Sequence, residues 1–140
     1  MILKEYTTGR EFMGRLDYDS DLYNSLTAIA SEMNIETGVI ELIGACRKAK
    51  VAIYDQEKKT YNCLSFEKPM EILSCTGNIS KKEGKTFLHL HITLAGEDGM
   101  VVGGHVLEGT RVFAGEFYIR ELKGAILDRK FDETTGLALW

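Results

Sequence analysis

The amino-acid sequence predicts an α+β domain with a mostly antiparallel β-sheet and one main N-terminal helix packed on it. Two observations carry this prediction. Only one segment, close to the N-terminus, keeps a helical spacing of apolar residues. Most of the remaining chain consists of short runs rich in β-branched and aromatic residues, separated by turn residues or charges. Strands joined by short turns pair antiparallel, so this order favours one sheet covered by the helix.

The helix is expected over residues 21–33, DLYNSLTAIASEM. Its apolar residues recur at i, i+4, i+7, i+8 and i+11 and therefore share one face: Leu22, Leu26, Ile29, Ala30 and Met33. A side-chain oxygen of Asp19 or Ser20 is expected to cap the first turn, where acidic residues also suit the helix dipole. We expect the apolar face of the helix to pack on the sheet.

The strands are expected to follow the helix. They cover residues 39–44, 51–55, 60–66, 70–77, 86–94, 100–107 and 111–122. Segments 80–85 and 95–99 are typical of hairpin turns, because their glycines permit the positive φ that tight turns need. The chain holds one proline, Pro69, and no linker, repeat or low-complexity tract. Its 140 residues are therefore predicted to form a single domain over 1–140.

The composition is that of an ordinary soluble globular protein, with 44% hydrophobic and 27% charged residues. No apolar run reaches transmembrane length and the N-terminus has no pattern of a secretory signal, so a cytoplasmic protein is expected. The cysteines, Cys46, Cys63 and Cys75, are widely spaced and form no CxxC pair. We interpret all three as small buried apolar residues in a reducing compartment.

The distribution of charge bears on DNA binding. A net charge of −4 and a pI near 5.4 argue against attraction of the whole surface to phosphate polymers. Basic residues gather at 47–50, 57–59 and 81–85, all expected in turns, and a local basic patch stays open as an alternative. The sequence has no helix-turn-helix or AT-hook and no aromatic residues among these lysines, so solvated turns are favoured. Any DNA binding is expected to be non-specific and salt-dependent.

All three histidines lie in one segment, 87–105, FLHLHITLAGEDGMVVGGH. In a strand, alternate side chains point to opposite faces, so the leucines and isoleucine of 88–94 form a core face. His89 and His91 share the opposite face, with Cα atoms about 6.6 Å apart. If 95–99 is a turn, His105 returns beside them, and the two preceding glycines leave room for a close approach.

This arrangement predicts a three-histidine metal site. Three imidazoles suit zinc and leave its fourth position open to a small anionic or carbonyl ligand. The alternative is a set of exposed polar-face histidines without a common partner. Glu116 is the best candidate for an acid or base beside the metal. In the strand 111–122 the apolar face is expected to consist of Phe113, Gly115, Phe117 and Ile119. Glu116 then lies on the opposite face, with Tyr118 and Arg120. A structural ion pair, or a hydrogen bond to the second nitrogen of a ligand histidine, is the alternative role for Glu116.

Glu108 and Arg111 flank the apparent turn 108–110 and are weaker candidates for the same role, since exposed charges at a turn are usually only solvated. A phosphate-binding loop is not indicated, because the Gly-Gly pair before His105 has no following lysine and helix. No GxSxG motif is present for a serine nucleophile.

Several runs resemble a known family, the plants-and-prokaryotes-conserved (PPC) domain in its stand-alone prokaryotic form. They are 71–80, EILSCTGNIS, then 88–109, LHLHITLAGEDGMVVGGHVLEG, and the ending 135–140, TGLALW. The opening 9–26, GREFMGRLDYDSDLYNSL, fits the start of that domain, so the resemblance spans essentially the whole chain. Its most specific part is the H-x-H…G-G-H pattern.

The resemblance implies an α+β domain that assembles as a homotrimer. In plants the domain follows an AT-hook and serves in assembly, and prokaryotic members have been described as DNA-binding proteins. The fold is also similar to that of acetolactate decarboxylase, whose zinc is held by an HxH pair and a downstream histidine. His89, His91 and His105 match that ligand pattern, whereas the catalytic glutamates and arginine of the enzyme match no motif here.

Three hypotheses of function follow. The first is a zinc-dependent enzyme or sensor for a small molecule, with a pocket beside the histidines. The second is a DNA-associated or scaffolding protein without catalytic activity. The third is a protein in which the metal only stabilises the fold.

Overall fold

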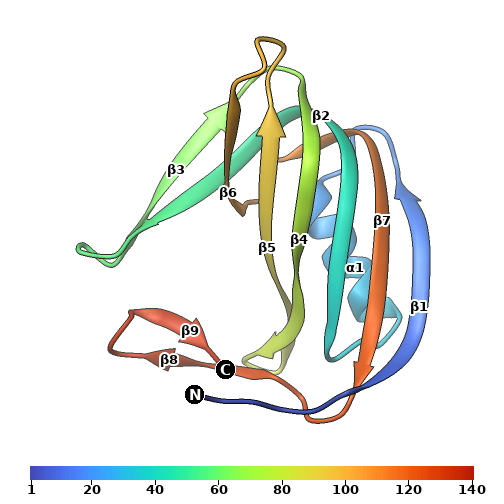
Figure 1. The fold of residues 1–140 in the computed structure, drawn as a ribbon, viewed down its shortest axis with the longest axis vertical. Coiled ribbons are helices and arrows are strands. Elements are labelled where there is room, and N and C mark those ends of the chain that lie inside the picture. The colour runs from blue at the N-terminus through green and yellow to red at the C-terminus, as the bar shows by residue number, and fades with distance from the viewer.

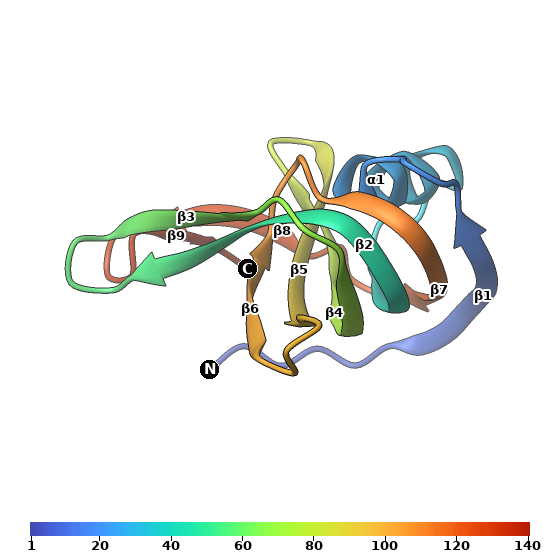
Figure 2. The ribbon, with the colours of Figure 1, turned by 90° about the horizontal axis from the view of Figure 1, so that it is seen from above.

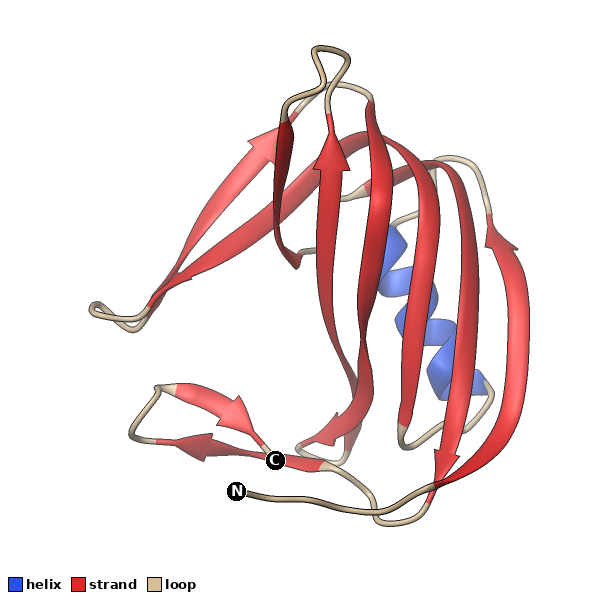
Figure 3. Cartoon of the chain, viewed as in Figure 1, coloured by secondary structure: helices blue, strands red, loops and turns tan.

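A computed structural model describes residues 1–140 as one large, strongly bent β-sheet with a single helix on one face (Figures 1 and 3). The elements are β1 (Thr7–Leu16), α1 (Leu22–Glu32), β2 (Gly38–Asp55), β3 (Thr60–Phe66), β4 (Met70–Lys82), β5 (Lys85–Ala95), β6 (Val101–Val106), β7 (Arg111–Lys123), β8 (Asp128–Asp132) and β9 (Leu137–Leu139). The predicted class, mostly antiparallel sheet with one N-terminal helix, is confirmed.

The strands pair in the order β1-β7-β2-β6-β5-β4-β8-β9, and β3 pairs with the outer part of β2. Strand β2 also pairs with β4, so that β2, β6, β5 and β4 form a closed ring of paired strands. Every pairing is antiparallel except the short contact of β4 with β8 at Lys81 and Lys82. Strands β1, β8 and β9 were not expected from the sequence.

Strand β2 is longer than predicted. The segments expected as two strands, 39–44 and 51–55, form one strand of 18 residues. Residues 47–50 therefore lie within a strand rather than in a turn, and this prediction was wrong. Cys46 and Ala49 are buried there, while the charged ends of the basic residues between and after them stay in water. The outer half of β2 and β3 form a hairpin arm that projects from the body (Figure 1).

The N-cap of α1 lies one residue after the predicted candidates. Asp21, not Asp19 or Ser20, is the N-cap, because its Oδ1 accepts a hydrogen bond from Asn24 N at 3.0 Å. Asp19 adopts a positive φ of 60° and is instead ion-paired to Arg47 and Arg111. Figure 2 shows α1 lying along one face of the sheet.

The hydrophobic core fills the space between α1 and the sheet. Leu22, Leu26 and Ala30 of the helix are fully buried there, as predicted, whereas Met33 at the C-cap is partly exposed. The predicted core face of β5 is confirmed, since each of its residues is at most 2% exposed: Leu88, Leu90, Ile92 and Leu94. Burial of each such side chain contributes about 1.5–3 kcal/mol, so this face of β5 is a principal source of stability.

Two predictions of burial were wrong. Cys63 lies exposed on β3, whereas Cys46 and Cys75 are buried as expected. Phe113 is 59% exposed, and Val112 takes the core position instead. The β2–β7 ladder shifts register between Ala45 and Cys46, and such a bulge reverses which side chains face inward. From Gly115 onward the predicted alternation of β7 holds.

The single helix has 11 residues, and the structure contains no helix with the length and hydrophobicity needed to cross a membrane.

Candidate metal centre

The structure brings the three histidines together from two neighbouring strands. His89 and His91 project from β5, and His105 on β6 is the direct cross-strand partner of His91. The turn between these strands, residues 96–100, gives the antiparallel return that the sequence predicted. Their face of β5 is opposite the core face, as expected from the alternation.

One ring nitrogen from each of the three residues lies within 4.8 Å of the other two. His89 Nε2 is 3.1 Å from His105 Nδ1 and 3.2 Å from His91 Nε2. Nitrogens bound to one tetrahedral zinc ion at 2.0–2.1 Å would be about 3.3 Å apart. The separations therefore fit a common ion, and no fourth His, Cys, Asp or Glu joins the group.

The electrostatics of the site favour neutral imidazoles, the form that binds metals. Burial, followed by charge repulsion from His105, Arg129 and His91, lowers the pKa of His89 to about 4. Burial and the neighbouring His91 also lower the pKa of His105. At neutral pH these two rings thus offer lone pairs rather than protons.

Glycines let the strands approach closely enough to bring the rings together. A Cβ atom added to Gly104 would lie 2.6 Å from the carbonyl oxygen of Ala52 on β2. A Cβ at Gly103 would collide with the carbonyl oxygen of Ile92, and one at Gly77 with that of His89. Close approach, rather than a positive φ, explains why these positions are glycine.

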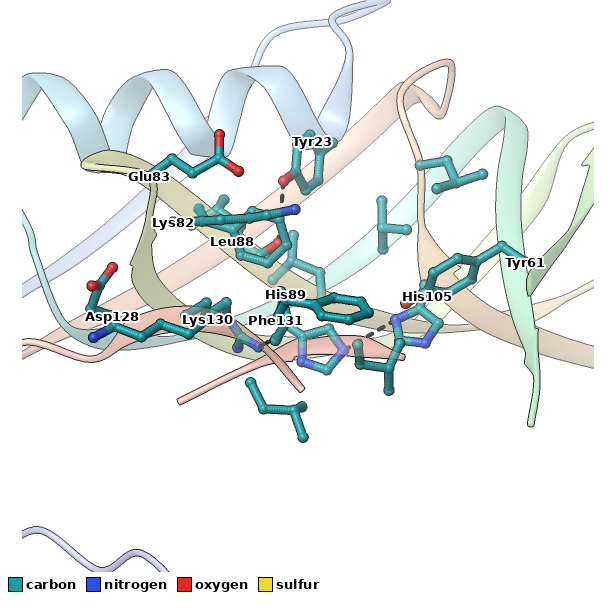
Figure 4. A pocket seen from close by; sticks show the side chains of 18 of the residues that line it. Tyr23, Tyr61, Lys82, Glu83, Leu88, His89, His105, Asp128, Lys130 and Phe131 are labelled. Atoms are coloured by element: carbon teal, nitrogen blue, oxygen red, sulfur yellow. Dashed lines mark hydrogen bonds between the residues drawn. The ribbon is translucent and has the colours of Figure 1, made fainter. Parts of the chain in front are cut away.

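A cavity of about 950 Å³ opens beside His89 and His105. Figure 4 shows its wall, with Tyr61 from the arm next to His105 and Phe131 from β8 near His89. The centroid of the Tyr61 ring is 5.3 Å from that of His105. The β8–β9 hairpin closes one side, and its turn contacts the arm where Tyr54 Oη donates to the carbonyl oxygen of Thr135 at 2.8 Å.

Sequence reasoning missed Arg129 on β8, which lines the same cavity and is only 7% exposed. Its Nε donates to Ser80 Oγ at 2.8 Å, its Nη2 to Asn78 Oδ1 at 2.9 Å and its Nη1 to the carbonyl oxygen of Ala138 at 3.0 Å. The available signal was the run of turn-forming residues at 132–136, DETTG, which is typical of a hairpin turn.

The other candidates lie in different surroundings. Glu116 is exposed on β7, where it faces Arg15 of β1 and Ile43 of β2, on the face that also bears Tyr118 and Arg120. Within one chain it belongs neither to the histidine group nor to the cavity wall, so its role stays a prediction. Arg111 is ion-paired to Asp19 at 3.3 Å.

Glu108, the other flanking residue of the turn 108–110, does line the cavity.

The fold and the site define a β-rich domain with one covering helix and a surface group of three histidines. The model of the Plants and Prokaryotes Conserved domain (PCC, also written PPC) matches residues 3–123. The chain belongs to this family. A comparison with curated proteins gave no significant match.

Solved structures of relatives agree with this assignment. The metal-containing protein AF0104 from Archaeoglobus fulgidus is 44% identical, with a TM-score of 0.95, and the match covers 100% of this chain and 99% of that one. A PPC protein from Pyrococcus horikoshii is 34% identical, with a TM-score of 0.94 and coverage of 100% and 96%. A Bacteroides thetaiotaomicron protein whose name proposes DNA binding is 28% identical, with a TM-score of 0.85 and coverage of 96% and 95%.

The resemblance to acetolactate decarboxylase holds for the fold. The enzyme from Bacillus subtilis is 14% identical with a TM-score of 0.59, and the match covers 91% of this chain and 58% of that one. At this identity the likeness concerns the backbone alone.

Proposed function

We propose that the protein is a metal-binding PPC-domain protein that holds one zinc ion through His89, His91 and His105. The observation that carries the proposal is the convergence of three ring nitrogens within 4.8 Å with no fourth protein ligand. Structural zinc sites normally have four protein ligands, whereas sites that bind a ligand or substrate have three and an open position. The proposed site therefore accepts a small anionic or carbonyl molecule from the adjoining cavity.

One observation supports zinc as the ion, and a second supports metal binding itself. The ligand set is entirely imidazole, which suits zinc, whereas magnesium and calcium prefer carboxylate and carbonyl oxygens. The relative from Archaeoglobus fulgidus, 44% identical over the whole chain, is named as a metal-containing protein.

A zinc ion held by three imidazoles lowers the pKa of bound water to about 7 or polarises a carbonyl group. The chain itself contributes the rest of the site. Tyr61 lies against His105, and Arg129 adds a positive charge to the wall of the cavity. These features fit a sensor or an enzyme for a small molecule.

We further propose a homotrimer in the cytoplasm. The free cysteines fit a reducing compartment. Met13 and Ile43, on the face of the sheet that bears Glu116, are 85% and 58% exposed in one chain, and contact with a neighbouring copy would bury them. Glu116 does not join the histidine group of its own chain, but in such an assembly it would lie near the histidine group of a neighbouring copy.

The test is the metal content per chain, measured by mass spectrometry on untagged protein after supply of zinc. About one zinc per chain is expected, with loss in His89→Ala and in His91→Ala. Thr93→Ala is the matched control, because Thr93 is exposed on the same face of β5 two residues after His91. The absence of metal from the wild-type protein, or its retention in both histidine variants, would reject the proposal.

DNA binding is the second candidate, favoured by the name of the Bacteroides relative. Against it, part of the basic charge is already engaged within the chain: Arg47 pairs with Asp19, and Lys58 pairs with Asp55. An electrophoretic shift assay with duplex DNA at low and physiological salt decides between the two. We expect no complex at physiological salt, and a tight salt-resistant complex would favour the second candidate.

A further inference from the structure

Arg129 is a buried cation without an acidic partner. The residue is 93% buried, as its 7% exposure implies, and no carboxylate lies within ion-pairing distance of its guanidinium. Its three hydrogen bonds go to neutral oxygens. Burying a charge without a counter-charge is costly, and burial lowers the pKa of Arg129 accordingly. An anion from outside the chain would offset this cost.

The guanidinium has donors left for such an anion. It carries five N–H groups, of which three are used, so one remains on each terminal nitrogen. Two donors on a planar fork match the two oxygens of a carboxylate. The rings of Phe87 and Trp140 lie 5.2 and 5.9 Å from the Arg129 Cζ atom, and these contacts help to fix its plane.

Arg129 is held beside the histidines by the strands that carry them. Its partner Asn78 on β4 is the cross-strand partner of His89 on β5. Phe87, beneath the guanidinium, precedes His89 by two residues on the same face. The Cα atoms of Asn78 and Phe87 are therefore about 5–7 Å from that of His89. A molecule of a few carbon atoms spans this separation.

We propose that Arg129 is the carboxylate-binding residue of this site, and that the ligand is a small aliphatic acid with a hydroxyl or carbonyl oxygen. This inference rests on the proposed function: the acid group lies on Arg129 and the second oxygen faces the metal position. The aliphatic part fits the apolar wall of Phe131, Leu137 and Leu139. Tyr61, whose hydroxyl donates to no group of its own chain, faces the same cavity (Figure 4).

The test is calorimetric binding of matched acid and amide pairs, lactate with lactamide and pyruvate with pyruvamide, to zinc-loaded protein. The amides keep the size and the second oxygen but lack the charge. We expect at least one acid to bind about 10- to 100-fold more tightly than its amide, the range for a charge-assisted pair. Arg129→Gln should remove this preference, and Arg129→Lys should keep part of it because lysine retains the charge without the fork.

Equal affinity of acid and amide for the wild-type protein would overturn the proposal, as would an unchanged preference in Arg129→Gln. Tighter binding of inorganic phosphate than of lactate or pyruvate would show that the site prefers phosphate to a carboxylate, and would also overturn the proposal. If Arg129→Gln fails to fold, Arg129→Lys carries the comparison: a reduced preference for the acid supports the proposal, and an unchanged preference overturns it. The zinc content of each sample is measured in parallel. A protein that binds no zinc but still prefers acid over amide through Arg129 refutes the metal site and retains the carboxylate site.

Discussion

His91 and His105 are direct partners in the β5–β6 ladder, and the centroids of their rings are 4.3 Å apart. The geometry of the site is thus set by backbone register. Within the connecting turn, Gly96 N donates to the carbonyl oxygen of Met100 at 3.0 Å. Gly99 adopts a positive φ of 75°, which glycine tolerates without strain. A shift of one residue would turn His105 to the other face of the sheet.

Gly104→Ala is expected to weaken zinc binding at least tenfold and to lower the melting temperature. The added methyl group would lie 2.6 Å from the carbonyl oxygen of Ala52, so β6 must move away from β2 and carry His105 with it. Zinc titration and thermal unfolding measure the two effects. Val101→Ala, at an exposed position of β6, is the control and should change neither. Unaltered zinc affinity in Gly104→Ala would show that the ladder does not fix the site.

Removal of metal is expected to leave the protein folded. The core cluster of 22 buried residues lies on the other face of the sheet and includes no histidine. Zinc at 100 times its dissociation constant should stabilise the wild-type protein by about 2.7 kcal/mol, and His91→Ala should show no such gain. Circular dichroism and thermal unfolding with and without chelator test this. Complete unfolding on chelation would favour a metal that only maintains the fold.

One thiol per chain is expected to react rapidly with a thiol reagent under native conditions. Cys63 is exposed on β3, whereas burial raises the pKa of Cys46 to about 11 and that of Cys75 to about 12. After denaturation all three should react. Cys63→Ser is the control and should abolish the rapid phase. Slow reaction of every thiol in the native protein would mean that the arm is covered in the assembly.

Stability is expected to fall between about pH 4.5 and pH 2, in part through Glu121. Its carboxylate accepts hydrogen bonds from Arg10 and Lys123, and these lower its pKa from 4.5 to about 2. A pKa depressed in the folded state stabilises the fold above the unfolded value and loses this effect as the pH falls through the folded value. Glu121→Gln should therefore be less stable at pH 7 and less sensitive to acid across this window.

Thermal unfolding as a function of pH measures this effect. Glu67→Gln, whose exposed carboxylate pairs only with Lys48 at the surface, should behave as the wild type. An equal acid sensitivity of Glu121→Gln and the wild type would contradict the role given to Glu121.

Asp21→Ala is expected to destabilise the protein by about 1–2 kcal/mol. The carboxylate of Asp21 both caps the helix through Asn24 N and accepts a hydrogen bond from Gly109 N at 2.7 Å. The substitution removes the two bonds together. Chemical denaturation gives the change in the free energy of unfolding, and Asp17→Ala is the control outside the cap. A change below 0.5 kcal/mol, the usual range for surface substitutions, would argue against the double role of Asp21.

The helix and the core face of β5 could be predicted because local periodicity determines them. The histidine group was predicted for the same reason, since one alternating strand and one short turn suffice to bring His89, His91 and His105 together. Sequence alone did not predict features that depend on distant pairing. The exposure of Phe113 follows from a register shift in the β2–β7 ladder, and no local pattern reports such a shift.

The position of Arg129 also depends on contacts that are remote in sequence. It is held by Ser80 and Asn78, about fifty residues earlier in the chain. Glu116 shows the converse: its face of the strand was predicted, but proximity to the histidines required tertiary information that alternation does not contain.

The alternation along β5 also has an evolutionary meaning. Leu88 and Leu90 support the core, while His89 and His91, their immediate neighbours, carry the chemistry. Substitutions at odd-numbered positions of this strand can change what the protein binds without weakening its fold. Selection on ligand and selection on stability therefore act on separate residues of the same short segment. A scaffold of this kind can keep its architecture while its descendants exchange, modify or abandon the site.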